Sequence, residues 1–397
     1  MTDNVIILGA GFSFDAGIPL LGNFVERMWE YATRGRSGEK LLSAEDNEVL
    51  NKALDIRREL DGYHGRVSFD DRNLEDILSI LAFNVLGGGQ KDKNKLTAFA
   101  NAISTTIELS CNVKHGGFQR DGGFRAITEG SDIYRSFWKS LFKWKDHGNE
   151  LPAIITFNYD LVLERALLQT LINTYYSGYD ARTPFTTVSL DYKYKYFPLD
   201  IYKMKYLNYG GYSETKSGSA MEKTDSFAED THLNVELLKL HGSLNFPRNA
   251  AHLKKEVPTL VNPLNNPYII PPVSNKQSST AGDESWRTAL NRIQKAKNIV
   301  FVGYSLPRTD MYMQFFLKAA LGPNQELNRI TVFDPTLWND DSHSKEMRER
   351  YESCLAEQQR TRIQFNPPYR SERDAKIAGT AKHFIKVLSG NPNEIMF

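Results

Sequence analysis

The chain has 397 residues, and its 41% hydrophobic and 24% charged content is typical of a soluble globular protein. No apolar run approaches the roughly 20 residues that a helix needs to span a bilayer, which excludes a membrane-spanning protein. With 49 basic and 48 acidic residues, the chain has no overall field that would attract a polyanion, so direct binding of nucleic acid is not expected.

The cysteine content and the first residues narrow the class further. Cys111 and Cys354 are the only cysteines, so neither a disulfide framework nor a four-thiolate zinc site can form within one chain, and we expect no metal. Residues 1–4 contain no basic segment before the apolar stretch at 5–8 and therefore do not resemble a signal peptide. We expect a cytoplasmic protein without a membrane partner.

The first predicted strand is the apolar run at residues 5–8, which is followed at once by Gly9-Ala10-Gly11. A buried strand that turns tightly into a helix gives this pattern. Similar short runs recur at residues 153–157, 236–240, 298–302 and 329–333. Each ends in a polar or glycine-containing turn, as parallel strands do at the site-bearing edge of an open sheet. The predicted fold class is therefore α/β, with a Rossmann-like parallel sheet.

The strands are unevenly spaced, which predicts two insertions into one core. Residues 21–149 are expected to form a helical lobe, with helical patterns at 74–81 and 137–142 and glycine-rich loops at 87–93 and 116–123. Residues 172–233 form a second, Tyr/Lys-rich insertion. The catalytic core then consists of residues 1–20, 150–171 and 234–397.

Tyrosine and lysine alternate strictly in the second insertion between Asp191 and Phe197. A half-buried strand of a hairpin gives this alternation, with the tyrosines on one face and the lysines on the other. Interleaved aromatic and basic side chains can instead stack on nucleic acid. The near-neutral charge of the chain favours the hairpin.

Small residues from Gly9 to Ser13 stand where the first strand meets the predicted helix. There the backbone can approach a pyrophosphate and donate N–H groups at the positive end of the helix dipole. A dehydrogenase-type turn would need glycine at position 14, which is Phe14, so a hydride-transfer enzyme is disfavoured. A tight turn without a ligand is the alternative interpretation.

Polar residues follow the second and third strands. Asn158 and Asp160 come after the run at 153–157, and His241 comes after the run at 236–240. For Asn158 and Asp160 the alternative interpretation is an Asx-type cap of the following helix. For His241 it is a buried histidine that closes a strand end.

The motifs of the chain resemble those of sirtuins and occur in the same order. They are Gly9-Ala10-Gly11-x-Ser13, Gly17-Ile18-Pro19, Asn158-x-Asp160, His241-Gly242, Pro271-Pro272, Gly303-x-Ser305 and Asp334. Each motif alone is weak evidence, but the ordered set spans most of the chain. The resemblance implies a sirtuin-like fold that binds NAD.

The resemblance also implies roles for single residues. Asn158 would hold the nicotinamide ribose and a water, Asp160 would accept from the nicotinamide carboxamide, and His241 would be the general base toward a ribose hydroxyl. The residues that bind the rest of the cofactor would be Gly9, Ala10, Gly11, Ser13, Gly303, Ser305 and Asp334. Cleavage through an oxocarbenium-like sugar needs such fixed polar groups and a base more than a strong nucleophile.

Departures from the sirtuin pattern argue against protein deacylation. Leu20-Leu21-Gly22 replaces Asp-Phe-Arg, Phe157 replaces a glutamine, and the paired zinc cysteines are absent. The nicotinamide-side residues are kept, so the chain looks like the prokaryotic sirtuin-like effectors of antiphage defence, which hydrolyse NAD to nicotinamide and ADP-ribose. The alternatives are a non-catalytic NAD or ADP-ribose sensor and an NAD-dependent protein deacylase.

An enzyme that empties the NAD pool must be restrained until a signal arrives. We therefore expect a homo-oligomer whose activity depends on assembly with another protein. The resemblance implies a HerA-type ATPase or another sensor protein as that partner.

Overall fold

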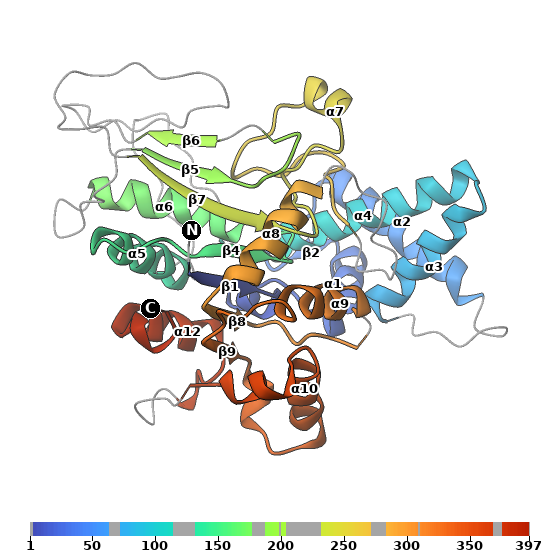
Figure 1. The fold of residues 1–397 in the computed structure, drawn as a ribbon. Helices are drawn as coiled ribbons and strands as arrows, with labels where there is room; N and C mark the ends of the chain where they lie inside the picture. The colour runs from blue at the N-terminus through green and yellow to red at the C-terminus, as the bar shows by residue number, and fades with distance from the viewer. Residues whose placement is uncertain are drawn as a thin grey trace.

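One eight-stranded sheet forms the centre of the molecule (Figure 1). The computed structural model describes residues 3–62, 72–113, 132–176, 187–197, 200–203, 232–270, 283–308, 310–367 and 375–396. The strands lie in the order β10-β9-β8-β1-β4-β7-β5-β6, and every neighbouring pair is parallel except β5 and β6. They are β1 (Asn4–Leu8), β4 (Ala153–Thr156), β5 (Thr187–Asp191), β6 (Asp200–Lys203), β7 (His232–Lys239), β8 (Asn298–Val302), β9 (Arg329–Phe333) and β10 (Ile363–Phe365). The predicted α/β fold and its five predicted strands are confirmed.

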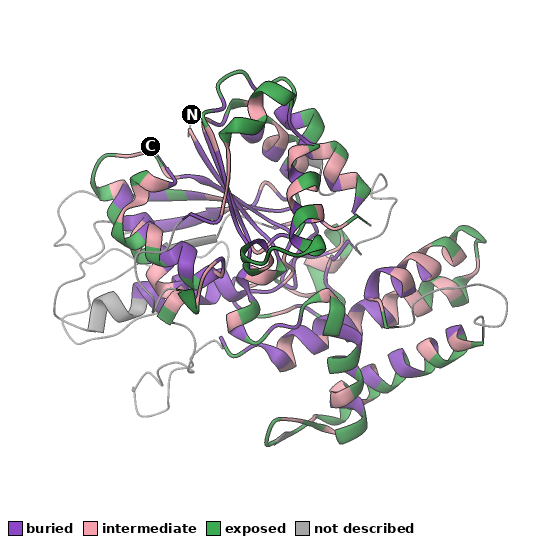
Figure 2. Ribbon diagram, turned by 90° about the horizontal axis from the view of Figure 1, so that it is seen from below, coloured by how far each residue is buried: buried purple, intermediate pink, exposed green. Residues whose placement is uncertain are grey.

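The central strands β1 and β8 are buried along their whole length, and Figure 2 shows the strands of the sheet mostly in the purple of buried residues. Parallel strands that are covered on both faces need apolar side chains on both. Because side chains alternate along a strand, Ile6 and Leu8 of β1 enter one core cluster, while Val5 and Ile7 enter the other. The continuous run at residues 5–8 follows from this double burial.

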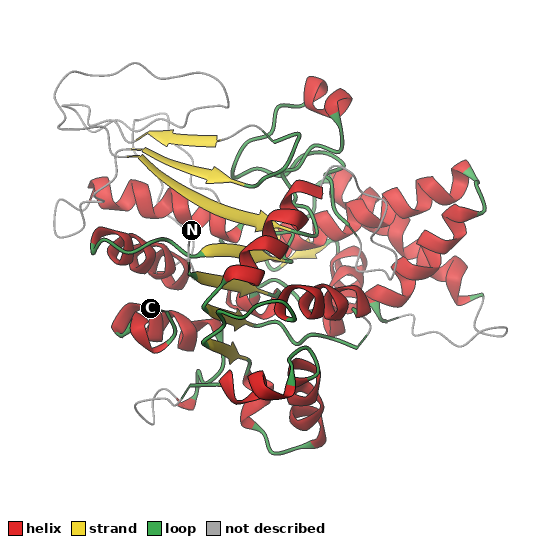
Figure 3. Cartoon of the chain, viewed as in Figure 1, coloured by secondary structure: helices red, strands yellow, loops and turns green. Residues whose placement is uncertain are grey.

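Helices cover both faces of the sheet (Figure 3). The face that holds Ile6 and Leu8 packs against α5 (Asp132–Asp146), α6 (Val162–Tyr176) and α12 (Ala381–Gly390). The opposite face packs against α8 (Asp283–Lys295), α9 (Met311–Leu321) and α10 (Ser342–Glu352). The short helix α7 (Ala250–Lys255) follows β7. Among the described residues, no helix is long and apolar enough to cross a bilayer.

A helical lobe lies beyond the carboxyl ends of the strands, on the right of Figure 1. It contains α1 (Leu21–Arg34), α2 (Ala44–Asp61), α3 (Leu74–Leu86), α4 (Gln90–Ser110) and a two-residue pairing of β2 (Arg36–Ser37) with β3 (Lys40–Leu41). The helices predicted at 74–81 and 137–142 are confirmed as parts of α3 and α5. The loop predicted at 87–93 is wrong beyond Gly89, because α4 begins at Gln90. The loop predicted at 116–123 falls outside the described residues.

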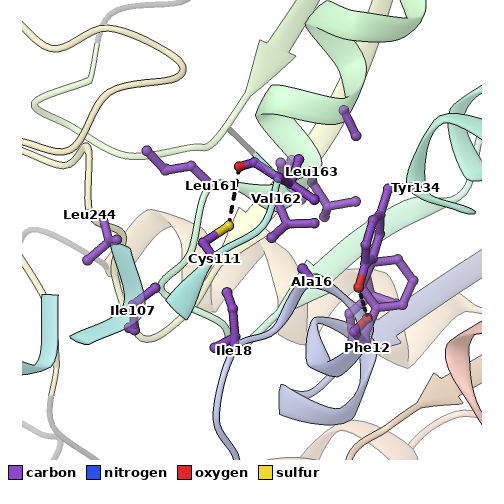
Figure 4. Close-up of a cluster of buried hydrophobic side chains, with 14 of the residues drawn as sticks. Phe12, Ala16, Ile18, Ile107, Cys111, Tyr134, Leu161, Val162, Leu163 and Leu244 are labelled. Carbon is purple, nitrogen blue, oxygen red and sulfur yellow. Dashed lines mark hydrogen bonds between the residues drawn. The ribbon is translucent and has the colours of Figure 1, made fainter. Parts of the chain in front are cut away.

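The segment after β1 differs from the predicted strand-to-helix turn. Two short 3-10 turns follow, Ala10–Phe12 and Phe14–Ala16, and the first α-helix begins only at Leu21. The predicted α-helix therefore does not start at Gly9–Ser13, and its dipole is not available to a ligand at this turn. Buried side chains hold the turns instead: in Figure 4 the ring of Phe12 lies beside Tyr134 of α5, whose hydroxyl donates to the Phe12 carbonyl at 2.9 Å.

The Tyr/Lys-rich segment contributes to the main sheet through β5 and β6. The strand predicted from Asp191 to Phe197 is wrong, because β5 ends at Asp191. The Asp191 carboxylate accepts from the amide of Lys193, which has a left-handed φ of 50°, and this local turn ends the ladder. Tyr192 and Tyr194 are nevertheless buried. The alternation of tyrosine and lysine therefore indicated correctly that these tyrosines are buried, although residues 192–197 do not pair with a neighbouring strand.

Candidate active site

A cavity of about 140 Å³ lies at the carboxyl ends of β1, β4, β7 and β8. Seven of the predicted site residues line it: Ala10, Ser13, Asn158, Asp160, His241, Gly303 and Ser305. Gly9 and Gly11 do not line the cavity and instead pack against the Gly303 loop. Asp334 does not line it either. Pro271 and Pro272 fall outside the described residues.

Glycine at positions 9, 11 and 303 allows two loops to touch through their backbones. The Gly9 amide donates to the Val302 carbonyl at 3.0 Å, and the Gly11 amide donates to the Gly303 carbonyl at 2.9 Å. A Cβ atom on Gly9 would lie 2.5 Å from the Gly303 oxygen, so a side chain there would force the loops apart. Backbone hydrogen bonds and close packing therefore hold the ends of β1 and β8 together next to the cavity.

Few amides of the glycine turn remain available to a ligand. The amides of Gly9, Gly11, Phe12 and Ser13 all donate to backbone carbonyls. Within the described residues, only the Ala10 amide of this turn has no acceptor, and Ala10 is exposed and lines the cavity. In this conformation the turn offers a phosphate group one amide, not several.

Asn158 joins the end of β4 to the glycine turn. Its Nδ2 atom donates to the Gly9 carbonyl and to Ser13 Oγ, both at 2.9 Å. Because a carbonyl oxygen can only accept, the bond to Gly9 fixes which way the amide faces. The Oδ1 atom of Asn158 receives no hydrogen bond from the part of the chain that the structure describes. Asn158 therefore brings a hydrogen-bond acceptor to the cavity.

The two carboxylate oxygens of Asp160 have different surroundings. Oδ1 accepts from the Val162 amide at 3.0 Å, at the first residue of α6. The helix-cap interpretation therefore describes this oxygen correctly. Asp160 is buried and lines the cavity, and its Oδ2 atom accepts no hydrogen bond from the described residues. Capping thus fixes the carboxylate and leaves one oxygen for a ligand.

His241 is buried at the end of β7 among aromatic rings. Its ring centroid lies 5.2 Å from that of Phe157, 6.3 Å from that of Tyr159 and 6.2 Å from that of Trp286. The chain turns sharply after it, because Gly242 has a φ of 85° and a Cβ there would lie 2.2 Å from the Tyr268 oxygen. The imidazole is thus held in one place on the cavity wall.

Two carboxylates that the sequence analysis did not select also line the cavity, Glu75 and Asp310. Glu75 lies in the first turn of α3 in the lobe and is buried. Asp310 caps α9 and accepts from the Tyr304 hydroxyl at 3.2 Å. Burial, reinforced by Asp310 and Glu75, raises the pKa of the Tyr159 and Tyr304 phenols well above the usual value, so both phenols stay protonated.

The lining of the cavity therefore combines carboxylates with apolar side chains. Its carboxylates are Asp160, Glu75 and Asp310, and within the described residues no lysine or arginine lines it. The apolar part comes from Ile18 and, in the lobe, from Leu21, Phe24, Leu74, Ile103 and Ile107. Figure 4 shows Ile18 and Ile107 among the buried apolar side chains of the core. Such a lining favours a ligand that carries a positive charge on an apolar ring.

Asp334 has a structural environment at the end of β9. Its carboxylate accepts from the Thr336 amide at 2.9 Å, while its backbone forms two bonds with the Asn366 side chain at 3.0 and 2.8 Å. Burial raises the pKa of this carboxyl. These contacts place Asp334 in the loop packing next to β9 and not on the cavity wall.

A model of the SIR2-like domain family matches residues 152–357, which is just over half of the chain. The chain belongs to the SIR2-like family. The matched segment contains Asn158, Asp160, His241, Gly303 and Ser305, and the fold is sirtuin-like. Membership indicates a function related to NAD, either enzymatic or as a sensor.

Two further comparisons add little. A solved structure described as "Structural Basis for the Mechanism and Regulation of Sir2 Enzymes" is 12% identical in sequence, with a TM-score of 0.30. The match covers 88% of this chain and 91% of the chain in that structure. At that TM-score the likeness carries no weight for fold or function. No curated protein matches the chain.

Proposed function

We propose that this SIR2-like protein is an NAD hydrolase, which cleaves the bond between nicotinamide and ribose to give nicotinamide and ADP-ribose. One observation carries the proposal: Asn158, Asp160 and His241, from the ends of two adjacent strands, line one small cavity together with two further carboxylates, and among the described residues no lysine or arginine lines it. The family match supports NAD as the dinucleotide.

The charge of the cavity suits this reaction. NAD carries its positive charge on the nicotinamide ring, and when the glycosidic bond breaks, the bonding electrons leave with neutral nicotinamide. The positive charge then spreads over the ribose C1 and ring oxygen, where nearby carboxylates and fixed polar groups stabilise it. Water adds to C1 and loses one proton, so NAD⁺ and H₂O yield nicotinamide, ADP-ribose and H⁺.

Each of the three residues has a role that its geometry permits. The Oδ1 atom of Asn158 accepts from the attacking water or a ribose hydroxyl. Asp160 uses Oδ2 to accept from the nicotinamide carboxamide, while Oδ1 caps α6. His241 acts as the general base, held by the surrounding rings.

The volume of the cavity limits what it holds. At about 140 Å³, it is well below the roughly 300–1,000 Å³ of pockets that enclose drug-sized ligands. It therefore accommodates the nicotinamide end of NAD, and the pyrophosphate must pass out near Ala10. In this proposal the anionic part of the dinucleotide stays away from the three carboxylates.

We further propose that the enzyme depletes NAD in antiphage defence, as a homo-oligomer that works with a HerA-type ATPase or another sensor protein. The need to restrain an NAD hydrolase supports this role, and the lobe that covers one side of the cavity offers a means of restraint. Mass photometry across a dilution series, with NAD turnover measured at each concentration, tests it. A fully active monomer that needs no partner would contradict it.

The enzymatic test is incubation of the purified chain with NAD, with and without an acylated peptide, and quantification of the products. Hydrolysis predicts equal amounts of nicotinamide and ADP-ribose, with no dependence on peptide. Acyl-ADP-ribose in the presence of peptide would identify a deacylase instead. Tight NAD binding without any product, in the presence of the partner as well, would identify a sensor.

A further inference from the structure

A buried ion pair lies directly behind the proposed nicotinamide site. Lys239 of β7 and Glu164 of α6 have side chains that are only 2% and 1% exposed. The Lys239 ammonium donates to Glu164 Oε1 at 2.9 Å and to the backbone carbonyl of Asp160 at 2.5 Å. Tyr192 donates its hydroxyl to the same Glu164 oxygen at 3.2 Å.

Stability alone is a poor reason for this pair. Removing an ammonium and a carboxylate from water is costly, and apolar side chains of similar size stabilise a core at least as well. What the ion pair supplies is a fixed distance between two elements. Here those elements are β7, which ends at Lys239 two residues before His241, and α6, which directly follows the loop that carries Asn158 and Asp160.

We propose that Lys239 is a positioning residue for NAD cleavage, because it ties the Asp160 backbone to the end of β7, two residues before His241. The Asp160 carbonyl is held by Lys239, and its carboxylate Oδ1 is held by the Val162 amide. These two hydrogen bonds restrict the directions that Oδ2 can face. This inference rests on the proposed function, since Asp160 is there assigned to the nicotinamide carboxamide.

The test measures binding constants, which do not depend on how many molecules are folded and active. Dissociation constants for NAD and for free nicotinamide are determined by calorimetry for the parent, Lys239→Met and Lys297→Met. Lys297 is the control, because it also pairs with a carboxylate, that of Asp3 at 2.8 Å, but in a more exposed position before the amino ends of β8 and β1. Lys239→Met should weaken nicotinamide binding by about tenfold, while Lys297→Met should leave it within about twofold.

Two further variants keep the proposal testable if Lys239→Met folds poorly. Glu164→Gln removes the charge but keeps an acceptor for Lys239 and Tyr192, so its effect on nicotinamide binding should lie between those of the parent and Lys239→Met. Asp160→Asn combined with Lys239→Met should bind nicotinamide no more weakly than Asp160→Asn alone, because both changes act through Asp160.

The outcomes separate the two proposals. Unchanged nicotinamide binding in Lys239→Met and Glu164→Gln, or full additivity in the double variant, would overturn the role of Lys239 while leaving NAD hydrolysis in place. A parent protein that binds neither NAD nor nicotinamide would overturn the proposed function itself.

Discussion

The two walls of the cavity are built in different ways. The sheet wall consists of strand ends whose polar side chains are held by short hydrogen bonds, such as those from Asn158 to Gly9 and Ser13. The lobe wall consists of apolar side chains from α1, α3 and α4, with Glu75 as its carboxylate. Fixed polar groups serve chemistry, whereas apolar side chains exclude water and shape the pocket. Changes in the sheet wall should therefore reduce turnover, and changes in the lobe wall should mainly reduce affinity.

The largest effect is expected for His241→Ala in the sheet wall. Loss of the general base should lower the rate of nicotinamide release by about a thousandfold. The fold should survive, because the hydrogen bond from the Ile270 amide uses the His241 carbonyl and not its ring. Near-ultraviolet circular dichroism checks the fold. Activity within twofold of the parent in a well-folded variant would remove His241 from the mechanism.

Asn158→Ala should reduce turnover by about a hundredfold and weaken NAD binding much less. The carboxylates and the Ala10 amide still face the ligand in this variant. Steady-state kinetics gives the turnover number, and calorimetry on the same preparation gives the dissociation constant for NAD. If the dissociation constant rises as much as the turnover falls, the side chain of Asn158 has a structural role through Gly9 and Ser13.

Glu75→Gln tests the lobe wall. It removes one of three carboxylates beside the cationic ring, so KM for NAD should rise by about tenfold while kcat stays within about threefold. Glu48→Gln on the exposed surface of α2 is the control and should change neither constant. A selective fall in kcat for Glu75→Gln would instead place this residue with the chemical groups of the sheet wall.

Glu108→Gln tests the connection between the two walls. Glu108 of α4 accepts two hydrogen bonds from the buried Arg165 of α6, at 3.1 and 2.9 Å. The free energy of unfolding should fall by about 2 kcal/mol, as measured by urea denaturation. In the control Glu59→Gln, which breaks a more exposed pair with Lys95, the loss should stay below about 1 kcal/mol. Equal losses would show that the buried pair does not anchor the lobe.

The smallest effect is expected for metal removal. Exhaustive chelation should leave NAD turnover unchanged, and metal analysis should show no stoichiometric zinc. Within the described residues no group of three or more His, Cys, Asp or Glu side chains could hold a metal. One zinc per chain, or loss of activity on chelation, would contradict this expectation.

The sheet wall could largely be predicted from the sequence, and the lobe wall could not. Runs of apolar residues indicate parallel strands, and residues that directly follow such strands meet at one edge of the sheet. The sequence therefore predicted that Asn158, Asp160 and His241 lie close together. Glu75 lies in a helix of the inserted lobe, and no local pattern shows which face of that helix meets the sheet. Its contribution depends on tertiary packing alone.

Local backbone conformation also limited what could be predicted. Glycine and alanine at 9–11 permit both a helix start and a 3-10 turn, and packing against Gly303 decides between them. Asp334 follows a strand like the other site residues, but its partner Asn366 comes 32 residues later, directly after β10. Asp310 could have been noticed as an N-cap before an apolar helix.

The most direct test is a structure of the His241→Ala variant with NAD bound. The nicotinamide ring should occupy the cavity between the sheet wall and the lobe wall, with its carboxamide next to Asp160 Oδ2 and the ribose C1 next to Asn158. The pyrophosphate should leave near Ala10, away from Glu75 and Asp310. NAD bound with its nicotinamide ring outside this cavity would contradict the proposal.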